Sequence, residues 1–358
     1  MYAVIMAGGR GVRFWPMSRE KRPKHLLDIF GSRTLIQETI DRILPIIPSD
    51  RIFVVTSITH ADELTRQLPE IPRENILVEP MGRNTAPCIG LAALTIMKKD
   101  PGAIMVVLPA DHRIESEEKL RQILLTAADA ARNGKTLVTI GIPPTGPVTG
   151  YGYLEQGPLK ETIAGVSVYH VQSIREKPGA EQTKEFLSRG GFLWNSGMFV
   201  WKASAILEAI ALWLPDIHQG LMDMDLSLGT PDECSIIEQV YGRMKSISID
   251  YGVMEKADNV AVIPGDFGWS DVGSWDAIWE IASKDGQGNS SPNQARIIAV
   301  DSYDNLIQVK DKLIALVDVK DLIIVETDDE LLICKRGASQ DIRKVVEILE
   351  NKKMTGYL

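Results

Sequence analysis

The sequence contains little that would cross-link the chain or place it in a membrane. Among its 358 residues there are only three cysteines, Cys88, Cys234 and Cys334, and none of them forms a CxxC pair. Neither a disulfide framework nor a zinc site is therefore predicted. No stretch approaches the roughly 18 uncharged apolar residues of a membrane span, and the apolar N-terminus is too short for a signal peptide. We expect a cytoplasmic protein with reduced thiols.

Positive charge is also in short supply. Lys and Arg number 39 against 48 Asp and Glu, which leaves a net charge of −9. Affinity for a phosphate backbone requires surplus Lys and Arg, so we expect no general binding to nucleic acid. With 44% hydrophobic residues, a chain of this length can fill the cores of about two domains. The composition is that of an ordinary globular protein.

The first 140 residues alternate short apolar runs with longer amphipathic ones. This alternation predicts a Rossmann-like α/β fold with parallel strands joined by crossover helices, in which ligands bind beyond the carboxyl ends of the strands. For the whole sheet we expect a mixed, mainly parallel arrangement flanked by helices. The expected strands are 2–6, 51–56, 75–79, 103–108 and 136–140, and the expected helices are 34–44, 60–68, 84–99 and 116–132.

The remainder of the chain has a different texture. Residues 141–290 mix extended and helical runs, which we interpret as insertions that extend the sheet and build a second wall for a substrate. After a Gly/Asn/Ser-rich linker, Leu313, Leu322 and Leu331 recur at spacings of nine, which suggests a small β-helix-like domain closed by a helix over 339–350. The predicted domains are 1–285 and 294–358.

A glycine-rich segment follows the first strand. It reads Ala7-Gly8-Gly9-Arg10-Gly11-Val12-Arg13 and is followed by Pro23-Lys24. Glycines let a backbone approach phosphate closely, and Arg13 and Lys24 add full positive charges, so the segment is a candidate triphosphate cradle. The patterns of the P-loop and of the dinucleotide-binding loop are both absent. A glycine-rich turn with solvated basic residues is the structural alternative.

Two aspartates are candidate ligands for Mg²⁺. Asp111 follows the apolar run that ends at Leu108-Pro109, and Asp271 lies in Gly268-Trp269-Ser270-Asp271. Magnesium is commonly bound by one or two carboxylates together with phosphate oxygens. Taken alone, each aspartate could equally cap a helix or a turn.

Six motifs in order resemble those of the sugar-nucleotide pyrophosphorylase family. The resemblance covers residues 2 to about 350 and is strongest to bacterial mannose-1-phosphate guanylyltransferases, also called GDP-mannose pyrophosphorylases. The motifs are the glycine-rich loop ending in Pro23-Lys24, the run Leu108 to His112, Glu79 to Pro87, Arg175-Glu176-Lys177-Pro178, Trp194 to Phe199, and Gly268 to Asp271.

The resemblance implies roles for individual residues. Gly8, Gly9 and Gly11 would lie under the nucleotide, Arg13 and Lys24 would meet its phosphates, and Asp111 and Asp271 would hold Mg²⁺. The residues implied near guanine are Glu79, Arg83 and Asn84; those implied for the sugar phosphate are Gly152, Glu176, Asn195 and Lys177.

The family reaction converts mannose 1-phosphate and GTP into GDP-mannose and diphosphate. A phosphate monoester is mostly dianionic near pH 7, since its second pKa is about 6, so the attacking oxygen needs no general base. This agrees with the absence of a Ser-His-Asp or Cys-His constellation. A related transferase with another base or sugar is the alternative within this class, and a non-catalytic subunit that senses nucleotide sugars is the alternative outside it.

The C-terminal strands are expected to stabilise the protein and to contact none of the catalytic groups. Their exposed edges and apolar runs suggest self-association, so the sequence predicts a homodimer. Longer relatives carry an additional phosphomannose isomerase domain, and the resemblance implies transferase activity alone for this chain.

Overall fold

The computed structural model describes residues 1–9, 11–132, 134–227, 229–291 and 296–358. Its contacts divide the chain into two compact units. The first comprises Met1–Gly8, Asp41–Pro109 and Ile114–Trp269; the second comprises Gly9–Ile40, Ala110–Arg113 and Ser270–Leu358. Gly9 and residues 11–40 are thus grouped with the C-terminal strands, and the predicted domain boundaries, which follow the chain in order, stay a prediction.

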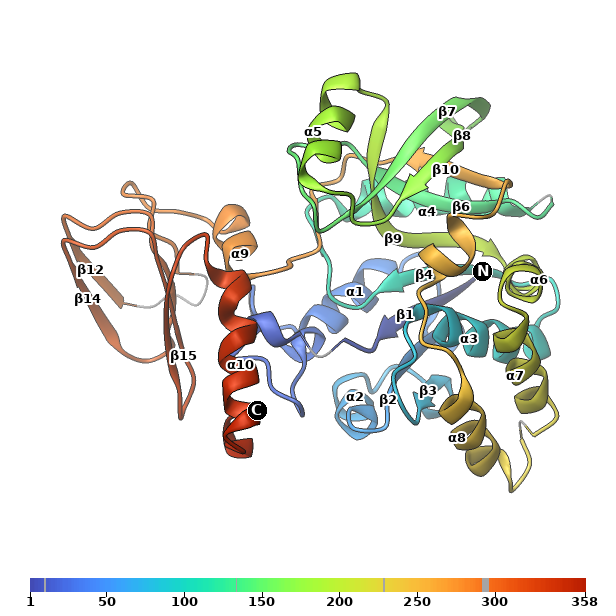
Figure 1. Ribbon diagram of the computed structural model, residues 1–358, viewed down its shortest axis with the longest axis horizontal. Helices are drawn as coiled ribbons and strands as arrows, with labels where there is room; N and C mark the ends of the chain where they lie inside the picture. The colour runs from blue at the N-terminus through green and yellow to red at the C-terminus, as the bar shows by residue number, and fades with distance from the viewer. Residues whose placement is uncertain (10, 133, 228, 292–295) are drawn as a thin grey trace. The chain divides into compact units, whose positions relative to one another are not determined.

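A nine-stranded sheet in the order β3-β2-β1-β4-β9-β6-β10-β8-β7 forms the first unit (Figure 1). Parallel pairs join β1 to β2 and β4, β2 to β3, and β6 to β10, whereas β8 and β9 run against their neighbours. The predicted mixed, mainly parallel sheet is confirmed. The strands are β1 (Tyr2–Ala7), β2 (Ile52–Ser57), β3 (Ile76–Glu79), β4 (Ile104–Pro109), β6 (Leu137–Ile142), β7 (Gly152–Ile163), β8 (Val166–Arg175), β9 (Phe192–Lys202) and β10 (Val260–Pro264).

Helices flank this sheet, and α3, α6, α7 and α8 lie together (Figure 1). Their apolar faces join the strands in one buried cluster that includes Val4, Ala92, Trp201 and Leu221. Strands β1, β2 and β4 are buried along almost their whole length, as expected of strands covered on both faces. The helices are α2 (Ala61–Gln67), α3 (Thr85–Lys99), α4 (Glu117–Arg132), α5 (Ala180–Arg189), α6 (Ala203–Trp213), α7 (Pro215–Asp225) and α8 (Glu233–Arg243), while α1 (Leu35–Ile43) contains the boundary between the units.

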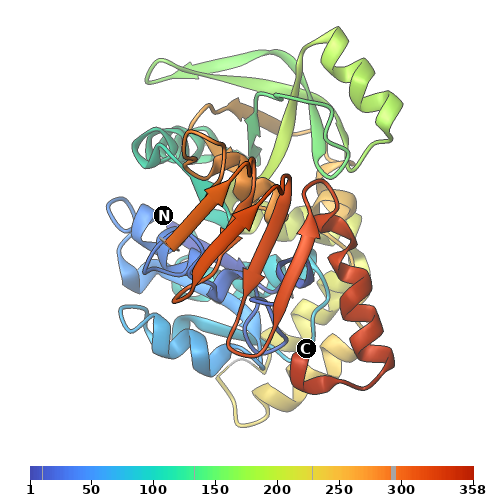
Figure 2. The same ribbon diagram turned by 90° about the vertical axis from the view of Figure 1, so that its left-hand side faces the viewer.

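The C-terminal strands of the second unit form a small coil (Figure 2). Parallel pairing joins Arg296 to Leu313 and Leu306 to Ile323, so each turn of the coil takes 17 residues, or two strands. This confirms the predicted β-rich domain. Leu313 and Leu322 lie on successive strands of the coil, about half a turn apart, whereas Leu322 and Leu331 lie on β15 and β16, which pair antiparallel. The strands are β12 (Arg296–Val300), β13 (Leu306–Gln308), β14 (Leu313–Val317), β15 (Leu322–Glu326) and β16 (Leu331–Lys335), and the helices of the second unit are α9 (Trp275–Ile281) and α10 (Ile342–Asn351). The short strands β5 (Arg113–Ile114) and β11 (Trp269–Ser270) pair with each other and contain the boundary between the units.

Aspartates mark the corners of the coil. Asp301 and Asp318 have φ of 48° and 51°, and Asp304 and Asp321 have φ of 57° each. Asp301 and Asp318 are one turn of the coil apart, and so are Asp304 and Asp321. Aspartate tolerates this left-handed conformation better than most residues because its short polar side chain bonds to the local backbone. The corners therefore repeat with the strands.

The hydrophobic core of the second unit is built from both ends of the chain. Phe14, Trp15 and Leu27, from the segment after the glycines, share one buried cluster with Ile323 of β15 and Ile342 of α10. The apolar side of the glycine-rich segment is therefore covered by the C-terminal domain. A separate small cluster of Ile307, Val309 and Leu316 fills the coil itself.

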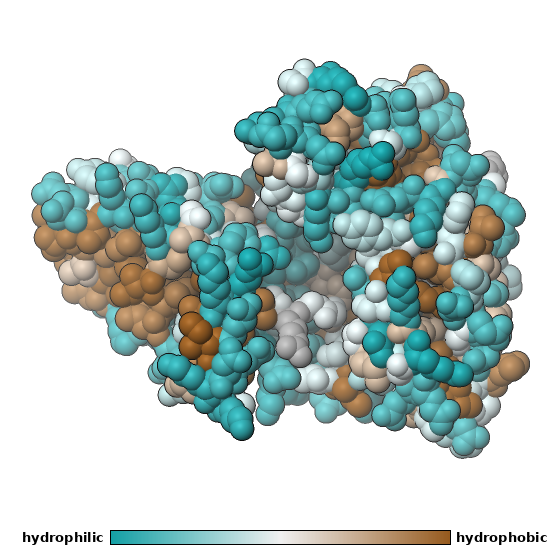
Figure 3. All heavy atoms as spheres, in the orientation of Figure 1, coloured by the Kyte–Doolittle hydropathy of each residue, from teal (hydrophilic) through white to brown (hydrophobic). Residues whose placement is uncertain are grey.

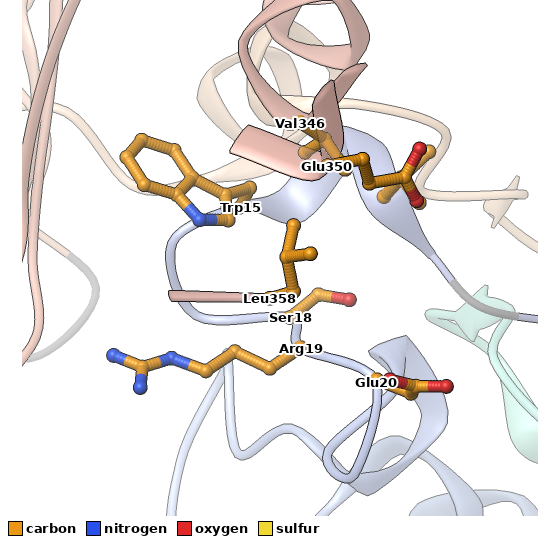
Figure 4. Close-up of a pocket in the computed structure, with 8 residues that line it drawn as sticks. Trp15, Ser18, Arg19, Glu20, Val346, Glu350 and Leu358 are labelled. Carbon is orange, nitrogen blue, oxygen red and sulfur yellow. The ribbon is translucent and has the colours of Figure 1, made fainter. Parts of the chain in front are cut away.

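Hydrogen bonds hold the same two regions together. The Nε1 atom of Trp15 donates to the carbonyl of Tyr357 at 2.8 Å, and Arg19 forms ion pairs with Asp329 and Glu330. Figure 4 shows the pocket where Trp15 and Arg19 meet α10 and Leu358. The segment that follows the glycines is thus attached to the C-terminal region by apolar, polar and charged contacts. In the part of the chain that the structure describes, no helix is long and apolar enough to cross a membrane.

Replacing Ile323 by alanine tests this shared core. Ile323 is fully buried, and truncation of a buried isoleucine to alanine costs about 2–5 kcal/mol. The matched control is Ile333→Ala, because Ile333 lies on the neighbouring strand but is 62% exposed, and its replacement should cost less than about 0.5 kcal/mol. Urea unfolding measures both values, and equal losses would contradict the assigned core.

Candidate active site

Lys24 is a buried cation that lines a second pocket of this unit, distinct from the one in Figure 4. It opens a short 3-10 turn (Lys24–Leu26) and is only 6% exposed. Its Nζ atom lies 2.9 Å from Oδ2 of Asp111, donates to the backbone carbonyl of Asp271 at 2.5 Å, and lies 5.6 Å from the centre of the Phe14 ring. A buried ammonium group is costly unless it is paired and hydrogen-bonded. These contacts supply that compensation.

Gly11 permits the close packing around Lys24. Its φ is +65°, and a Cβ built on it would lie 2.6 Å from Cβ of Lys24 and 2.9 Å from its backbone nitrogen. Only glycine allows both this conformation and this approach. Gly9 and Gly11 line the same pocket as Arg13, Lys24, Asp111 and Asp271. All four predicted catalytic residues are therefore brought together within the second unit.

Asp111 is held as a carboxylate. Burial alone would raise its pKa, but the positive charge of Lys24, helped by His112, outweighs burial and lowers the pKa to about 2. The side chain thus stays ionised throughout the neutral range and can act as an anionic ligand. Its partner Asp271 lines the same pocket and lies close enough to Gly273 that a Cβ there would be 3.0 Å from Oδ2 of Asp271.

Two carboxylates suit a metal ion that shares its coordination with a substrate. Mg²⁺ usually keeps one or two protein carboxylates and takes its other ligands from phosphate and water. Among the described residues there is no cluster of three or more His, Cys, Asp or Glu that would hold a metal by itself. Asp111 and Asp271 therefore fit a phosphate-bound Mg²⁺ rather than a closed structural site.

Arg13 shows that the C-terminal region does reach the pocket. Its Nη1 atom donates to Oε1 of Gln340 at 3.4 Å, in the turn that precedes α10. The expectation that the C-terminal strands contact none of the catalytic groups stays a prediction, because Gln340 follows the last strand, β16. A contact between residues 327 positions apart leaves no mark in local spacing.

In the first unit, Glu79 offers a buried acceptor at the end of β3. Its carboxyl group is 5% exposed, and a Cβ built on Gly8 would lie 4.0 Å from Oε2. Burial raises its pKa to about 7, against the opposing effect of nearby Tyr241. Gly8 and Glu79, which are both predicted to lie at the nucleotide, are thus neighbours. Oε1 of Glu79 receives no hydrogen bond from the described part of the protein.

Arg83 and Asn84 have structural tasks in the same loop. Arg83 donates from Nε to the carbonyl of Tyr241 at 2.7 Å and from Nη2 to that of Gly242 at 2.9 Å, at the C-terminal end of α8. Asn84 has φ of 68° and accepts a hydrogen bond from the backbone N–H of Thr85 where α3 begins. Their roles at the nucleotide stay predictions.

The predicted sugar residues converge in the first unit. Strand register places Asn195 opposite Gly152, and a Cβ on Gly152 would collide with the Glu176 carboxylate and lie 3.1 Å from Cβ of Asn195. Lys177 has φ of 49°, and its Nζ atom lies 3.6 Å from Oε1 of Glu176. Burial raises the pKa of Glu176 to about 7, the negative charge of Asp250 adds to this, and Lys177 opposes it.

Sequence reasoning missed two groups that border these sugar residues. Asp250 accepts a hydrogen bond from Nδ2 of Asn195 at 2.7 Å. The ring of Tyr151 contacts the rings of Trp194 and Trp269 edge to face, with centres 5.0 and 5.2 Å away. The aromatic run Gly150-Tyr151-Gly152-Tyr153 could have drawn attention to Tyr151, whereas nothing local to Asp250 marks it as a partner of Asn195.

This α/β sheet and the pocket of cations, carboxylates and glycine backbone define a nucleotidyltransferase. The sequence matches the nucleotidyl transferase family over residues 2–288 and the MannoseP isomerase/GMP-like beta-helix domain family over residues 295–349. The chain belongs to the mannose-1-phosphate guanylyltransferase family, and the predicted family and enzyme class are confirmed.

Individual relatives support this assignment. A mannose-1-phosphate guanylyltransferase of Escherichia coli is 39% identical over 357 residues, which is 99% of this chain and 75% of the relative. The alginate biosynthesis protein AlgA of Pseudomonas aeruginosa is 36% identical, over 98% of this chain and 72% of the relative. A crystal structure from Thermus thermophilus, described as a mannose-1-phosphate geranyltransferase, has a TM-score of 0.86 at 34% identity and covers 98% of this chain and 99% of its own.

The Asp111→Asn variant should show a pH-dependent loss of stability. Because the folded-state pKa of about 2 lies below the ordinary 3.8, the carboxylate stabilises the fold above pH 4, and this contribution is lost as the pH falls towards 2. Urea unfolding should find the largest gap between the native protein and the variant at pH 6–7, narrowing towards pH 3.

The control is Asp129→Asn, which removes an exposed ion pair with Arg132 and should cost less than about 1 kcal/mol at every pH. A gap for Asp111→Asn that did not narrow below pH 4 would contradict the charged pair between Lys24 and Asp111.

Proposed function

We propose that this chain converts α-D-mannose 1-phosphate and GTP into GDP-mannose and diphosphate. The observation that carries the proposal is the pocket that Arg13 and Lys24 line together with Asp111 and Asp271, because this combination of charges suits a magnesium triphosphate. Identity of 36–39% to relatives over nearly the whole chain supports GTP and mannose 1-phosphate as the particular substrates.

The chemistry requires positioning and charge neutralisation. A phosphate oxygen of mannose 1-phosphate forms a bond to the α-phosphorus of GTP, and the bond from that phosphorus to the oxygen bridging to the β-phosphorus breaks. The bridging oxygen and its electron pair leave with diphosphate. Because the attacking oxygen is already anionic near pH 7, no residue has to remove a proton. Holding the reactants in line and offsetting their charge are the main sources of acceleration.

Lys24 and Arg13 supply fixed positive charge for this step. Lys24 is held in place by Asp111 and the Asp271 carbonyl, so its ammonium group needs little reorganisation when negative charge develops on the phosphates. Asp111 and Asp271 would hold Mg²⁺, which when bound would neutralise phosphate oxygens and polarise the α-phosphorus. Lys177, whose side chain is 61% exposed, would bind the phosphate of the sugar.

Guanine presents two neighbouring donors, N1–H and the N2 amino group, that a single carboxylate can accept. Glu79 is suited to this task because its Oε1 atom is buried and has no hydrogen-bond partner among the described residues. Adenine presents no such pair of donors. A carboxylate at this position would therefore favour GTP over ATP, which supports the guanosine nucleotide over the alternative bases.

A substrate panel tests the proposed reaction directly. The native protein with Mg²⁺ is incubated with GTP, ATP, UTP or dTTP and with mannose 1-phosphate or glucose 1-phosphate, and diphosphate release is measured. We expect release only when both substrates are present, and fastest with GTP and mannose 1-phosphate. Faster release with another pair would identify a related transferase, and no release with any pair would support the sensing subunit.

The same panel on Glu79→Gln tests the assignment of the base. A pKa of about 7 means that the native carboxyl is largely protonated at pH 6 and ionised at pH 8, so the KM for GTP should fall as the pH rises through 7. Glutamine cannot ionise, and it replaces one of the two acceptor oxygens by an NH₂ donor. The Glu79→Gln variant should lose most of the preference for GTP over ATP, and its KM for GTP should no longer fall as the pH rises through 7. An unchanged preference for GTP would exclude Glu79 as the residue that recognises the base.

We also infer that the protein forms a homodimer through an apolar face of its C-terminal coil. Ile298 and Val300 of β12 and Leu313 and Val317 of β14 are 51–65% exposed. Paired register places them on one face of the two strands, and Figure 3 shows hydrophobic residues gathered there. A contiguous exposed apolar face of this kind is typical of an interface, and a second copy supplies a matching one.

Adding charge to this face should dissociate the dimer. Light scattering on the full chain should give a dimer mass for the native protein and a monomer mass for the double variant Leu313→Lys/Val317→Lys. The control is Leu212→Lys, because Leu212 is 69% exposed on α6, outside the face. Deleting the strands would be a poor test because they also cover the apolar side of the glycine-rich segment. An unchanged mass for the double variant would rule out this face.

A further inference from the structure

The turn that carries Asp250 contacts the predicted sugar residues. It is a single π-helical turn (Asp250–Met254), a rare element that often occurs at functional sites. Gly252 within it packs so closely on the junction of α6 and α7 that a Cβ there would lie 2.7 Å from Leu214. The turn is therefore held by close packing against this junction.

This turn and Glu255, which follows it, contact two of the four predicted sugar residues, Asn195 on β9 and Glu176 directly after β8. The backbone N–H of Glu176 donates to Oε1 of Glu255 at 3.1 Å, and the hydroxyl of Tyr251 donates to the carbonyl of Glu176 at 3.4 Å. Asp250 accepts from Asn195 at 2.7 Å. One short turn thus fixes the backbone of Glu176 and the side chain of Asn195.

The hydrogen bonds of Asn195 determine how its amide group is presented. A carboxylate accepts only, so the contact with Asp250 requires the Nδ2 atom of Asn195 to face it. The Oδ1 atom already has a donor, since the backbone N–H of Gly197 lies 3.3 Å away. The Thr139 hydroxyl, 3.2 Å away, can donate either to this atom or to the carbonyl of Met198. Among the described residues, the second N–H of Nδ2 is the donor of this amide that remains to bind a ligand.

We propose that Asp250 is a positioning residue for the hexose, holding the Asn195 amide so that its second N–H donates to a sugar hydroxyl. The inference rests on the proposed function. Asp250 is needed because an amide can rotate by half a turn at little cost; without an acceptor on this side, its oxygen could take the place of the nitrogen. The sugar hydroxyl, which should accept a hydrogen bond from the Asn195 amide, would then face the amide oxygen, which cannot donate one.

The charges around Asp250 are consistent with this role. Glu176, Glu255 and Lys177 are the charged groups that influence it, and burial raises its pKa while the bond from Asn195 opposes that rise. The Asn195 contact therefore stabilises the ionised, acceptor-only form. The turn is also attached to the loop after β3, since Ile249 N–H donates to the hydroxyl of Thr85 at 2.8 Å. A purely structural defect at residue 250 would disturb that loop as well.

Two substitutions separate positioning from charge and from folding. Asp250→Leu keeps the branching at Cγ but removes the acceptor, whereas Asp250→Asn keeps a carbonyl oxygen that can accept from Asn195. In steady-state assays of the full chain with Mg²⁺, we expect Asp250→Leu to raise the KM for mannose 1-phosphate about tenfold, as for loss of one hydrogen bond, with KM for GTP within about twofold. Asp250→Asn should recover most of this loss. The control is Asp258→Leu, which replaces an exposed carboxylate nearby in the chain.

Any other result of these KM assays contradicts the positioning role of Asp250. An unchanged KM for mannose 1-phosphate in Asp250→Leu would remove any role at the sugar. An equal rise in both KM values would indicate a structural defect, and a loss in Asp250→Asn as large as in Asp250→Leu would indicate that charge rather than position matters. If the native protein forms no GDP-mannose, the proposed function itself fails; if it is active and Asp250→Leu is unaffected, the positioning role alone fails.

Deoxy analogues identify the hydroxyl and give a readout that stability does not change. Mannose 1-phosphates lacking the hydroxyl at C2, C3, C4 or C6 are compared in the native protein, Asn195→Ala and Asp250→Leu. One analogue should be a poorer substrate than mannose 1-phosphate for the native protein but not for either variant. A deoxy penalty that persisted in Asp250→Leu for every analogue would overturn the proposal.

Discussion

The buried ammonium group of Lys24 is the feature on which the proposed phosphate-binding pocket depends. Its contacts join three segments of the second unit that are far apart in sequence: the turn that begins at Lys24, Asp111 at the end of an apolar strand, and the loop that carries Asp271. A lysine that is 6% exposed destabilises the fold unless it is compensated. The same contacts that compensate it also place a cation among the groups that would bind a triphosphate.

The C-terminal domain helps to build the segment that carries Lys24, so it is not an independent accessory domain. The glycine-rich segment has a polar side at the pocket and an apolar side, with Phe14 and Trp15, that is buried against β15 and α10. The coil thus covers the apolar surface that the nucleotide loop could not bury alone. Gln340 extends this support to the guanidinium of Arg13. Specificity for base and sugar is assigned to residues of the first unit, whose sheet supports them.

A sequence prediction succeeded where the pattern behind it lies in neighbouring residues of the chain, and failed where it depends on contacts between distant residues. Strand and helix periods predicted the sheet and the coil, because burial of every second or every third to fourth residue is visible in the chain itself. Motif residues such as Gly152 and Asn195 were predicted by resemblance, and the collision at a Gly152 Cβ now supplies a physical reason for the glycine. Asp250 and Gln340 were missed because each acts through one side-chain contact with a distant residue, which no local pattern encodes.

The most direct test of the central claim is the rate of diphosphate release by Lys24→Gln at saturating GTP, mannose 1-phosphate and Mg²⁺. The matched control is Lys21→Gln, because Lys21 is exposed and three residues away. The account predicts a loss of roughly 100- to 1,000-fold for Lys24→Gln, the range for removing one preorganised charged donor, and an unchanged rate for the control. A rate for Lys24→Gln within threefold of the native protein, with the fold intact by circular dichroism, would contradict it.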